Sequence, residues 1–129
     1  MYRKNRQISL FDFDMSTAQL NRDNPWIRLA DIIPWDTLED KYAGKFPDAG
    51  PRAISARIAV GALIVKNILH CTDERTVRHI SENPYIQYFI GLNSFTDKCP
   101  FGVSSMARFR ARVGREDLDA LEELIKETE

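Results

Sequence analysis

Cysteine is scarce in this chain, which has two among its 129 residues. Cys71 and Cys99 are far apart and form no CxxC pair, and together with His70 and His79 they do not match a zinc-ligand spacing. No paired base is indicated for either thiol, so a nucleophilic role has no support. We therefore expect no metal ion, no cofactor and no catalytic cysteine.

Long apolar runs are also missing. The longest, Ile58 to Val65, is interrupted only by Gly61 and stops at Lys66, far short of the ~20 residues that a membrane span needs. Met1 leads into the polar run YRKNRQ with no apolar stretch behind it, so no signal peptide is indicated. We expect a cytoplasmic chain with reduced thiols and no membrane partner.

An excess of positive charge is missing as well, because 18 basic residues face 19 acidic ones for a net charge of −1. Taken whole, this argues against a nucleic-acid binder, since such domains are usually basic. The charges are segregated, however. Residues 101–115 contain four arginines and no acid, whereas residues 116–129 contain seven acids and one lysine. This asymmetry of sign is more informative than the sum.

What the chain does have is helical patterning. Apolar residues at helical spacing, together with capping residues, predict an all-α fold in a compact multi-helix domain without a multi-strand sheet. The run 54–69 is apolar nearly all round, which predicts a central, buried helix. The core is expected to include Trp26, Trp35, Tyr85 and Phe89. The expected helices cover residues 25–33, 34–44, 54–69, 73–82, 84–90, 104–113 and 116–126.

The patterning divides the chain into three segments. Residues 1–24 have few periodic apolar positions and indicate an extended arm, in which the stretch ISLFDFD allows an isolated strand. Residues 25–115 form the helical domain. Residues 116–129 form an acidic amphipathic helix with one apolar face.

The expected helix over residues 104–113 has an arginine face and an apolar face. Arg108 and Arg112 are four residues apart and share a face, and Arg110 flanks it. The opposite face is formed by Met106, Phe109 and Val113. A helix anchored in this way can enter the major groove of DNA, where arginine suits phosphate oxygens or guanine edges.

Two serines open this helix, and we expect Ser104 or Ser105 to be its N-cap. Serine hydroxyls and helix N-terminal amides suit phosphates, so both serines join the candidate DNA contacts. The alternative is a solvated basic face that pairs with the acidic helix after it.

A second candidate lies in the helices expected at 54–69 and 73–82. The tight turn His70-Cys71-Thr72 joins them, and Thr72 is the expected N-cap of the second helix. The pair has helix-turn-helix proportions. If the second helix faces DNA, then Arg75, Arg78 and His79 lie toward it. A simple αα-hairpin is the alternative.

Three runs then follow one another in order: PWDTLEDKYAG, ARIAVGALIVKNILHCTDERTVRHISENPYIQYFIGL and CPFGVSSMARFRARVG. Together they resemble the N-terminal domain of bacterial insertion-sequence transposases of the IS5 type, over about residues 24–115. The opening NPWIRLADIIPWD fits the same pattern. His70 and Cys71 stand where relatives often have Gly and Leu. This departure changes the turn but not the expected order of helices.

The resemblance implies a DNA-binding and assembly module that recognises terminal inverted repeats. In that family it precedes a catalytic domain of RNase H-like fold, which uses three acidic residues and Mg²⁺. No residue here matches those acids, and the chain ends before such a domain could begin, so we expect a non-catalytic fragment or truncated transposase. The segment 104–112 is the candidate DNA-facing helix.

The sequence thus predicts a transposase domain that binds double-stranded DNA. The expected contacts are Ser104, Ser105, Arg108, Arg110 and Arg112, then Arg75 and Arg78, with Arg3, Lys4 and Arg6 of the arm on the backbone. The alternative is a helical self-association or protein-interaction module, a homodimer in which the arginine helix packs on the acidic helix of itself or of a partner.

Overall fold

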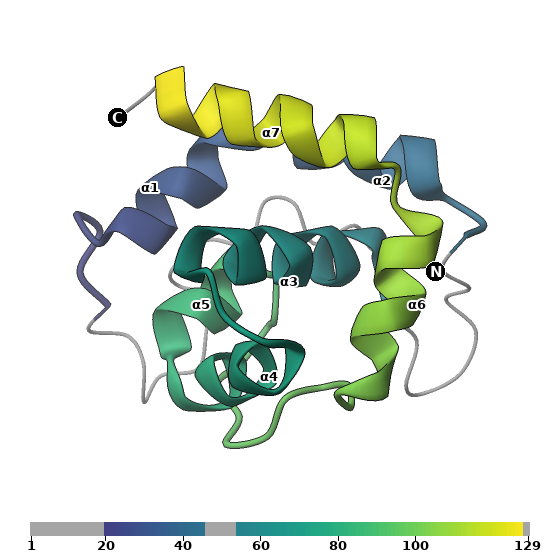
Figure 1. The fold of residues 1–129 in the computed structure, drawn as a ribbon. Coiled ribbons are helices and arrows are strands. Elements are labelled where there is room, and N and C mark those ends of the chain that lie inside the picture. The colour runs from purple at the N-terminus through teal and green to yellow at the C-terminus, as the bar shows by residue number, and fades with distance from the viewer. Residues whose placement is uncertain (1–19, 46–53, 128–129) are drawn as a thin grey trace.

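The structure is a computed structural model that describes residues 20–45 and 54–127, and every regular element in these ranges is a helix (Figure 1). The helices are α1 (Pro25–Ile32), α2 (Trp35–Tyr42), α3 (Ala56–Leu69), α4 (Asp73–Glu82), α5 (Pro84–Phe89), α6 (Ser104–Arg112) and α7 (Arg115–Glu127). The prediction of an all-α fold is confirmed. None of these helices is long and apolar enough to cross a membrane. The stretch considered for a strand, residues 8–14, lies outside the described residues.

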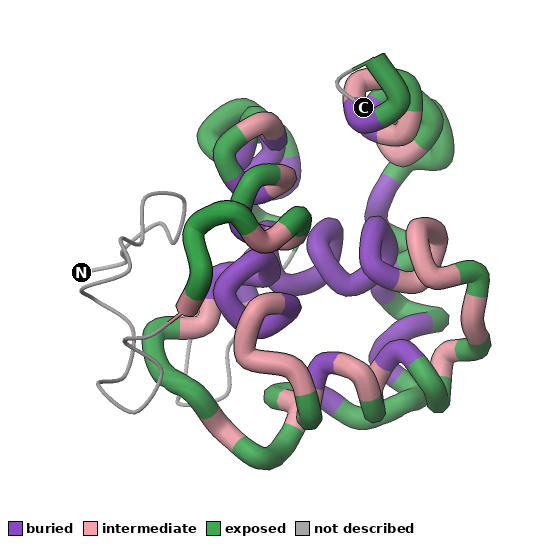
Figure 2. The backbone as a smooth tube through the Cα atoms, turned by 90° about the vertical axis from the view of Figure 1, so that its left-hand side faces the viewer, coloured by how far each residue is buried: buried purple, intermediate pink, exposed green. Residues whose placement is uncertain are grey.

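Helix α3 is the centre of the fold, as its all-round apolar sequence predicts. It contacts α2, α4, α6 and α7, and its residues from Ala56 to Val65 are buried. Figure 2 shows this buried backbone enclosed by helices whose outer sides are exposed. Gly61 allows close approach of the segment after α5, because a Cβ at this position would lie 2.9 Å from Cγ2 of Ile90. The packing is therefore close where α3 meets the segment after α5.

Local sequence signals set several helix ends. Asn24, Thr72 and Asn83 cap α1, α4 and α5, each accepting hydrogen bonds from backbone amides of the first turn. His70 ends α3 in the left-handed conformation (φ 50°, ψ 49°), which reverses the chain into α4 within three residues. The predicted tight turn between these two helices is confirmed.

A buried arginine joins α3 to the end of α5. Arg57 is only 2% exposed, and its guanidinium donates to the carbonyls of Phe89 (3.1 and 3.2 Å) and Tyr88 (3.2 Å). The carbonyl of Phe89 ends the helix and has no partner within it, so Arg57 satisfies a group that would otherwise be buried and unpaired, whereas the carbonyl of Tyr88 also accepts from the amide of Gly91 (3.0 Å). The guanidinium also lies 4.5 Å from the ring centroid of Trp35. Burial lowers the pKa of Arg57 to about 10, so it stays charged at neutral pH.

A buried glutamine fixes the loop that leads to α6. The Gln87 side chain donates to the carbonyls of Ile80 (2.8 Å) and Thr96 (2.7 Å), and it accepts from the amide of Thr96 (3.0 Å). Gln87 has no exposed surface, so these bonds form away from water, where an unmade bond is costly. The loop between α5 and α6 is thereby tied to both α4 and α5.

Helix α7 is joined to α2 by a polar contact. The Tyr42 hydroxyl donates to the Asp117 carboxylate and accepts from the amide of Gly114 (3.0 Å), while Lys41 Nζ lies 2.8 Å from Asp117 Oδ1. On the inner side of α7, Leu121 and Ile125 are buried in the same core as α3. The acidic helix therefore packs against the central helix and α2.

Candidate nucleic-acid interface

Helix α6 is fixed to the domain by the apolar face that the sequence predicts. Met106, Phe109 and Val113 are 0–4% exposed. Phe109 also packs edge-to-face on Phe101, with 4.9 Å between ring centroids. Together with the Gln87 contacts at the preceding loop, this packing makes α6 a rigid platform for its outer side chains.

The start of α6 differs from the expectation. Neither serine is the N-cap: that position is Val103, in helical conformation and without a side-chain cap bond. The prediction was wrong because backbone bonds already form the first turn, from the amide of Ser105 to the carbonyl of Gly102 (3.0 Å) and from Met106 to Val103 (3.1 Å). Ser105 is buried instead, and its hydroxyl accepts from Arg108 Nη2 (2.8 Å). Its contact is with Arg108, which it helps to orient.

The outer side of α6 consists of small residues between arginines. Ser104, Ala107 and Ala111 are exposed and lie at i, i+3 and i+7, opposite the buried face. Arg108 and Arg112 are exposed along one edge of this strip. The two alanines are a part of the surface that the sequence analysis did not single out, although their spacing opposite Met106 and Phe109 carried the signal.

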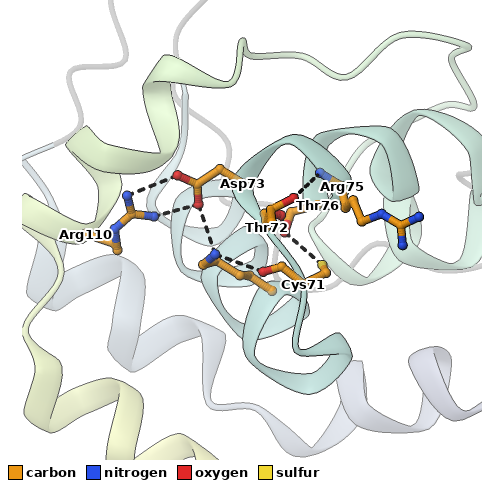
Figure 3. Close-up of polar contacts among 7 residues, drawn as sticks. Cys71, Thr72, Asp73, Arg75, Thr76 and Arg110 are labelled. Atoms are coloured by element: carbon orange, nitrogen blue, oxygen red, sulfur yellow. Dashed lines mark hydrogen bonds and ion pairs between the residues drawn. The ribbon is translucent and has the colours of Figure 1, made fainter.

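Arg110, on the other edge of the strip, is engaged by α4 (Figure 3). Its terminal nitrogens lie 2.7 and 3.1 Å from the two carboxylate oxygens of Asp73. Lys66 Nζ lies 3.2 Å from the same carboxylate and donates to the carbonyl of Cys71 (2.9 Å). Arg110, and to a lesser degree Lys66, hold the pKa of the Asp73 carboxyl below its ordinary value, so the group is ionised at neutral pH. The first turn of α4 is thus joined to both α3 and α6.

The arginines of α4 lie on a different side. Figure 3 shows the side chain of Arg75 extending away from Arg110. Arg75 and Arg78 are exposed and one turn apart, and their guanidiniums take part in no hydrogen bond or ion pair with residues 20–45 and 54–127. Glu74 and Glu82 are exposed on the same helix. The two predicted groups of arginines are therefore not brought together, and the exposed side of α4 has mixed charge.

Among the residues that the structure describes, the remaining polar groups offer no second site of this kind. Both cysteines are free thiols, and burial raises the pKa of Cys99 to about 11, which keeps it protonated. Within the described ranges, no three His, Cys, Asp or Glu side chains are grouped as metal ligands. A groove of about 240 Å³ separates the end of α3 from the second half of α7, away from α6. It is lined by Ile64, Asn67, Ile68, His70, Glu122, Ile125 and Lys126.

The arm residues Arg3, Lys4 and Arg6 lie outside the described residues, so their predicted contact with the DNA backbone stays a prediction. The same holds for the DNA role of the α4 and α6 arginines.

Comparison with known proteins identifies a family. A family model described as a transposase domain, DUF772, matches residues 14–112 of the chain. Among curated proteins, the uncharacterized protein ORF8 in the nfe locus of Rhizobium meliloti is 34% identical over 113 residues, which are 88% of this chain and 53% of that relative. The chain thus spans about half the length of the curated relative that it matches. No solved structure gives a significant match.

Proposed function

Because the chain belongs to the DUF772 family of transposase domains, we propose that it is a DNA-binding module of an IS5-type transposase, which recognises the terminal inverted repeats of the element. In this proposal the domain contributes recognition, and strand cleavage belongs to a separate catalytic domain. The partner is double-stranded DNA, and α6 is the element that meets it.

The observation that carries this proposal is the outer side of α6, where small residues lie between arginines and no acid is present. The major groove is about 12 Å wide, close to the diameter of an α-helix with its side chains. Small residues at the outermost positions let the backbone of the helix come close to the base edges. Arg108 and Arg112 then reach phosphates or guanines, and the methyl groups of Ala107 and Ala111 suit thymine methyls.

The anchoring of α6 supports the same proposal. The buried face and the Phe101–Phe109 contact hold the helix, and the Ser105 hydroxyl orients the Arg108 guanidinium. A recognition helix on a rigid support loses little conformational entropy on binding. Ser105 then acts through Arg108 and not directly on DNA, whereas the exposed Ser104 stays available to a phosphate.

Helix α4 is the weaker candidate, although it is the second helix of the α3–α4 pair that a tight turn joins. Its exposed arginines lie between Glu74 and Glu82, which repel phosphates. We assign Arg75 and Arg78 to the edge of the interface, where they add to the attraction for the DNA backbone.

Self-association is the second candidate function, and charge complementarity favours it. Helix α7 exposes Glu116, Asp119, Glu123 and Glu127, while α6 exposes arginines. Within one chain, Asp117 binds Lys41 and Tyr42 of α2, and Arg110 binds Asp73 of α4. Pairing between α6 of one copy and α7 of another gives a dimer that sedimentation detects. Loss of the dimer in a quadruple amide variant of the four acids supports this function.

The test of DNA binding compares two double variants that remove the same charge. Arg108→Ala with Arg112→Ala is expected to weaken binding to an inverted-repeat duplex and to reduce the salt dependence of the affinity. Arg75→Ala with Arg78→Ala is the matched control and is expected to weaken binding less. Equal affinity of the first variant and the unchanged chain, at equal stability, contradicts the assignment of α6.

A further inference from the structure

We infer that Asp73 is a built-in competitor of DNA phosphate for Arg110, so that the contact between α4 and α6 restrains the DNA affinity of this surface. The inference rests on the proposed function. Asp73 is negatively charged, whereas a DNA interface needs positive charge. It belongs to α4 and lies at the edge of the α6 surface, although it is 37 positions from Arg110 in the sequence.

The geometry of the pair carries the inference. Both terminal nitrogens of Arg110 are occupied by the two oxygens of one carboxylate, at 2.7 and 3.1 Å. This paired geometry is also the one in which a guanidinium binds a phosphate group. Asp73 therefore occupies the bidentate edge that Nη1 and Nη2 of Arg110 form, and its negative charge repels a phosphate that approaches the remaining donors, so the two anions compete for Arg110.

The exposure of the pair allows the exchange. The side chain of Arg110 is 43% exposed and that of Asp73 is 25% exposed, so a ligand can reach the guanidinium from solvent. Ion pairs with this degree of exposure are weak, because water and salt screen them. A phosphate of a duplex docked on α6 can therefore take over Arg110 without disrupting the core.

Lys66 makes the exchange less costly. Its ammonium group lies 3.2 Å from Asp73 Oδ1 and is held in place by its bond to the carbonyl of Cys71. When Arg110 turns to a phosphate, Asp73 keeps one cation. The cluster of Lys66, Asp73 and Arg110 thus has two satisfied arrangements, one in the free chain and one with DNA bound.

A consequence is that Asp73 weakens binding to any duplex backbone, whatever its sequence. In the free state it removes one arginine from the positive surface, and in the bound state its charge remains close to the phosphate. When Asp73 is removed, the phosphate contact of Arg110 no longer requires breaking an ion pair and is made at full occupancy, so the logarithmic salt dependence is expected to steepen by up to roughly 0.9.

The experiment measures binding of a labelled random-sequence DNA duplex by the unchanged chain, by Asp73→Asn and by Glu74→Gln. Glu74 is the matched control, because it is the next residue in the same helical turn, is exposed, and loses the same charge. Asp73→Asn is expected to bind roughly fivefold tighter with a steeper salt dependence, and Glu74→Gln to change affinity by less than about twofold. In Asp73→Asn with Arg110→Gln, the gain is expected to disappear.

Each result decides between the two proposals. If the unchanged chain binds DNA and Asp73→Asn binds no more tightly than Glu74→Gln, the inference is overturned and the proposed function stands. If the unchanged chain does not bind duplex at all, the proposed function is overturned and the inference falls with it.

A second measurement needs no variant, in case Asp73→Asn folds poorly. The Nε–Hε signal of Arg110 in the isotope-labelled chain reports the environment of its guanidinium. A displacement of this signal when duplex is added supports the exchange. An unchanged Arg110 signal, while other α6 signals move, overturns it.

Discussion

Helices α4 and α6 both expose arginines, and they differ in what lies among those arginines. On α6 the outermost residues are Ser104, Ala107 and Ala111, whereas on α4 the exposed positions include Glu74 and Glu82. Both helices are anchored to α3, so rigidity does not distinguish them. Our proposal therefore assigns the DNA-facing helix by the residues that lie among its arginines, and not by the number of arginines. The size and charge of the residues between them decide how closely a polyanion can approach.

Removing the arginines of each helix tests this comparison with the largest expected effect. Arg108→Ala with Arg112→Ala is expected to lower the affinity for inverted-repeat duplex by roughly 30-fold, about 2 kcal/mol, because two cations at the groove are lost. Arg75→Ala with Arg78→Ala is expected to lower it by less than about threefold. Fluorescence anisotropy at fixed salt measures both. A larger loss in the α4 variant than in the α6 variant reverses the assignment.

The common support of both helices is expected to respond to Gly61→Ala. The new Cβ would lie 2.9 Å from Ile90 Cγ2 and 3.2 Å from Ile90 Cα, so α3 and the segment after α5 must separate. We expect a loss of about 1–3 kcal/mol in the free energy of unfolding, measured by denaturant titration. The matched control is Gly102→Ala, where a Cβ meets no atom within 4 Å. Equal stability of the two variants contradicts the account of α3 packing.

Adding an acidic residue among the arginines of α6, as on α4, is expected to remove the advantage of α6 in binding DNA. Ala107→Glu places a carboxylate on the strip between the arginines, and we expect roughly tenfold weaker DNA binding through repulsion of phosphates. The glutamine of Ala107→Gln has nearly the same shape as glutamate but no charge. This variant therefore separates the effect of side-chain size from the effect of charge. Anisotropy measurements at low and high salt distinguish the two, because screening by salt restores only the loss that charge causes. A Glu variant that binds as well as the Gln variant means that this strip does not approach DNA.

The smallest expected effect concerns pH and the contacts that hold α6 and α7 in place. Arg110 and Lys66 lower the pKa of Asp73, and Lys41 and Tyr42 lower the pKa of Asp117. The pKa of an aspartate in the unfolded chain is about 3.9. An aspartate whose pKa is lower in the folded chain stabilises the fold at pH above about 3.9, and this stabilisation is lost as the pH falls through the lowered pKa. We expect the free energy of unfolding to decrease below about pH 4.

Asp117→Asn removes one of these two carboxylates and is expected to make that decrease shallower. Thermal unfolding from pH 6 to pH 2 measures it, with Asp119→Asn, an exposed acid on the same helix, as the control. If stability falls with pH equally in the unchanged chain and in both variants, Asp117 does not contribute to the loss of stability in acid.

Much of the fold could be predicted from the sequence because its signals are local. Thr72 and Asn83 determine where α4 and α5 begin, and the apolar run of α3 indicates its burial. The resemblance to a transposase domain also rests on residues that follow one another along the chain, and the family match agrees with it. Such signals depend on neighbours within about four positions, which the sequence shows directly.

The features that could not be predicted depend on distant partners. The Asp73–Arg110 pair joins positions 37 apart, and the contact of Arg57 with the end of α5 joins positions 31 and 32 apart. The burial of Ser105, whose hydroxyl contacts Arg108, follows from the way α6 packs on the core. Each of these is set by tertiary packing, for which helical spacing carries no signal.

The most direct test of the central claim is a map of amide and arginine side-chain signals in the isotope-labelled chain as inverted-repeat duplex is added. The account predicts that the largest displacements fall on Ser104, Ala107, Arg108, Ala111 and Arg112, with smaller ones at the start of α4. Displacements confined to α4 or to α7, with α6 unchanged, would contradict it.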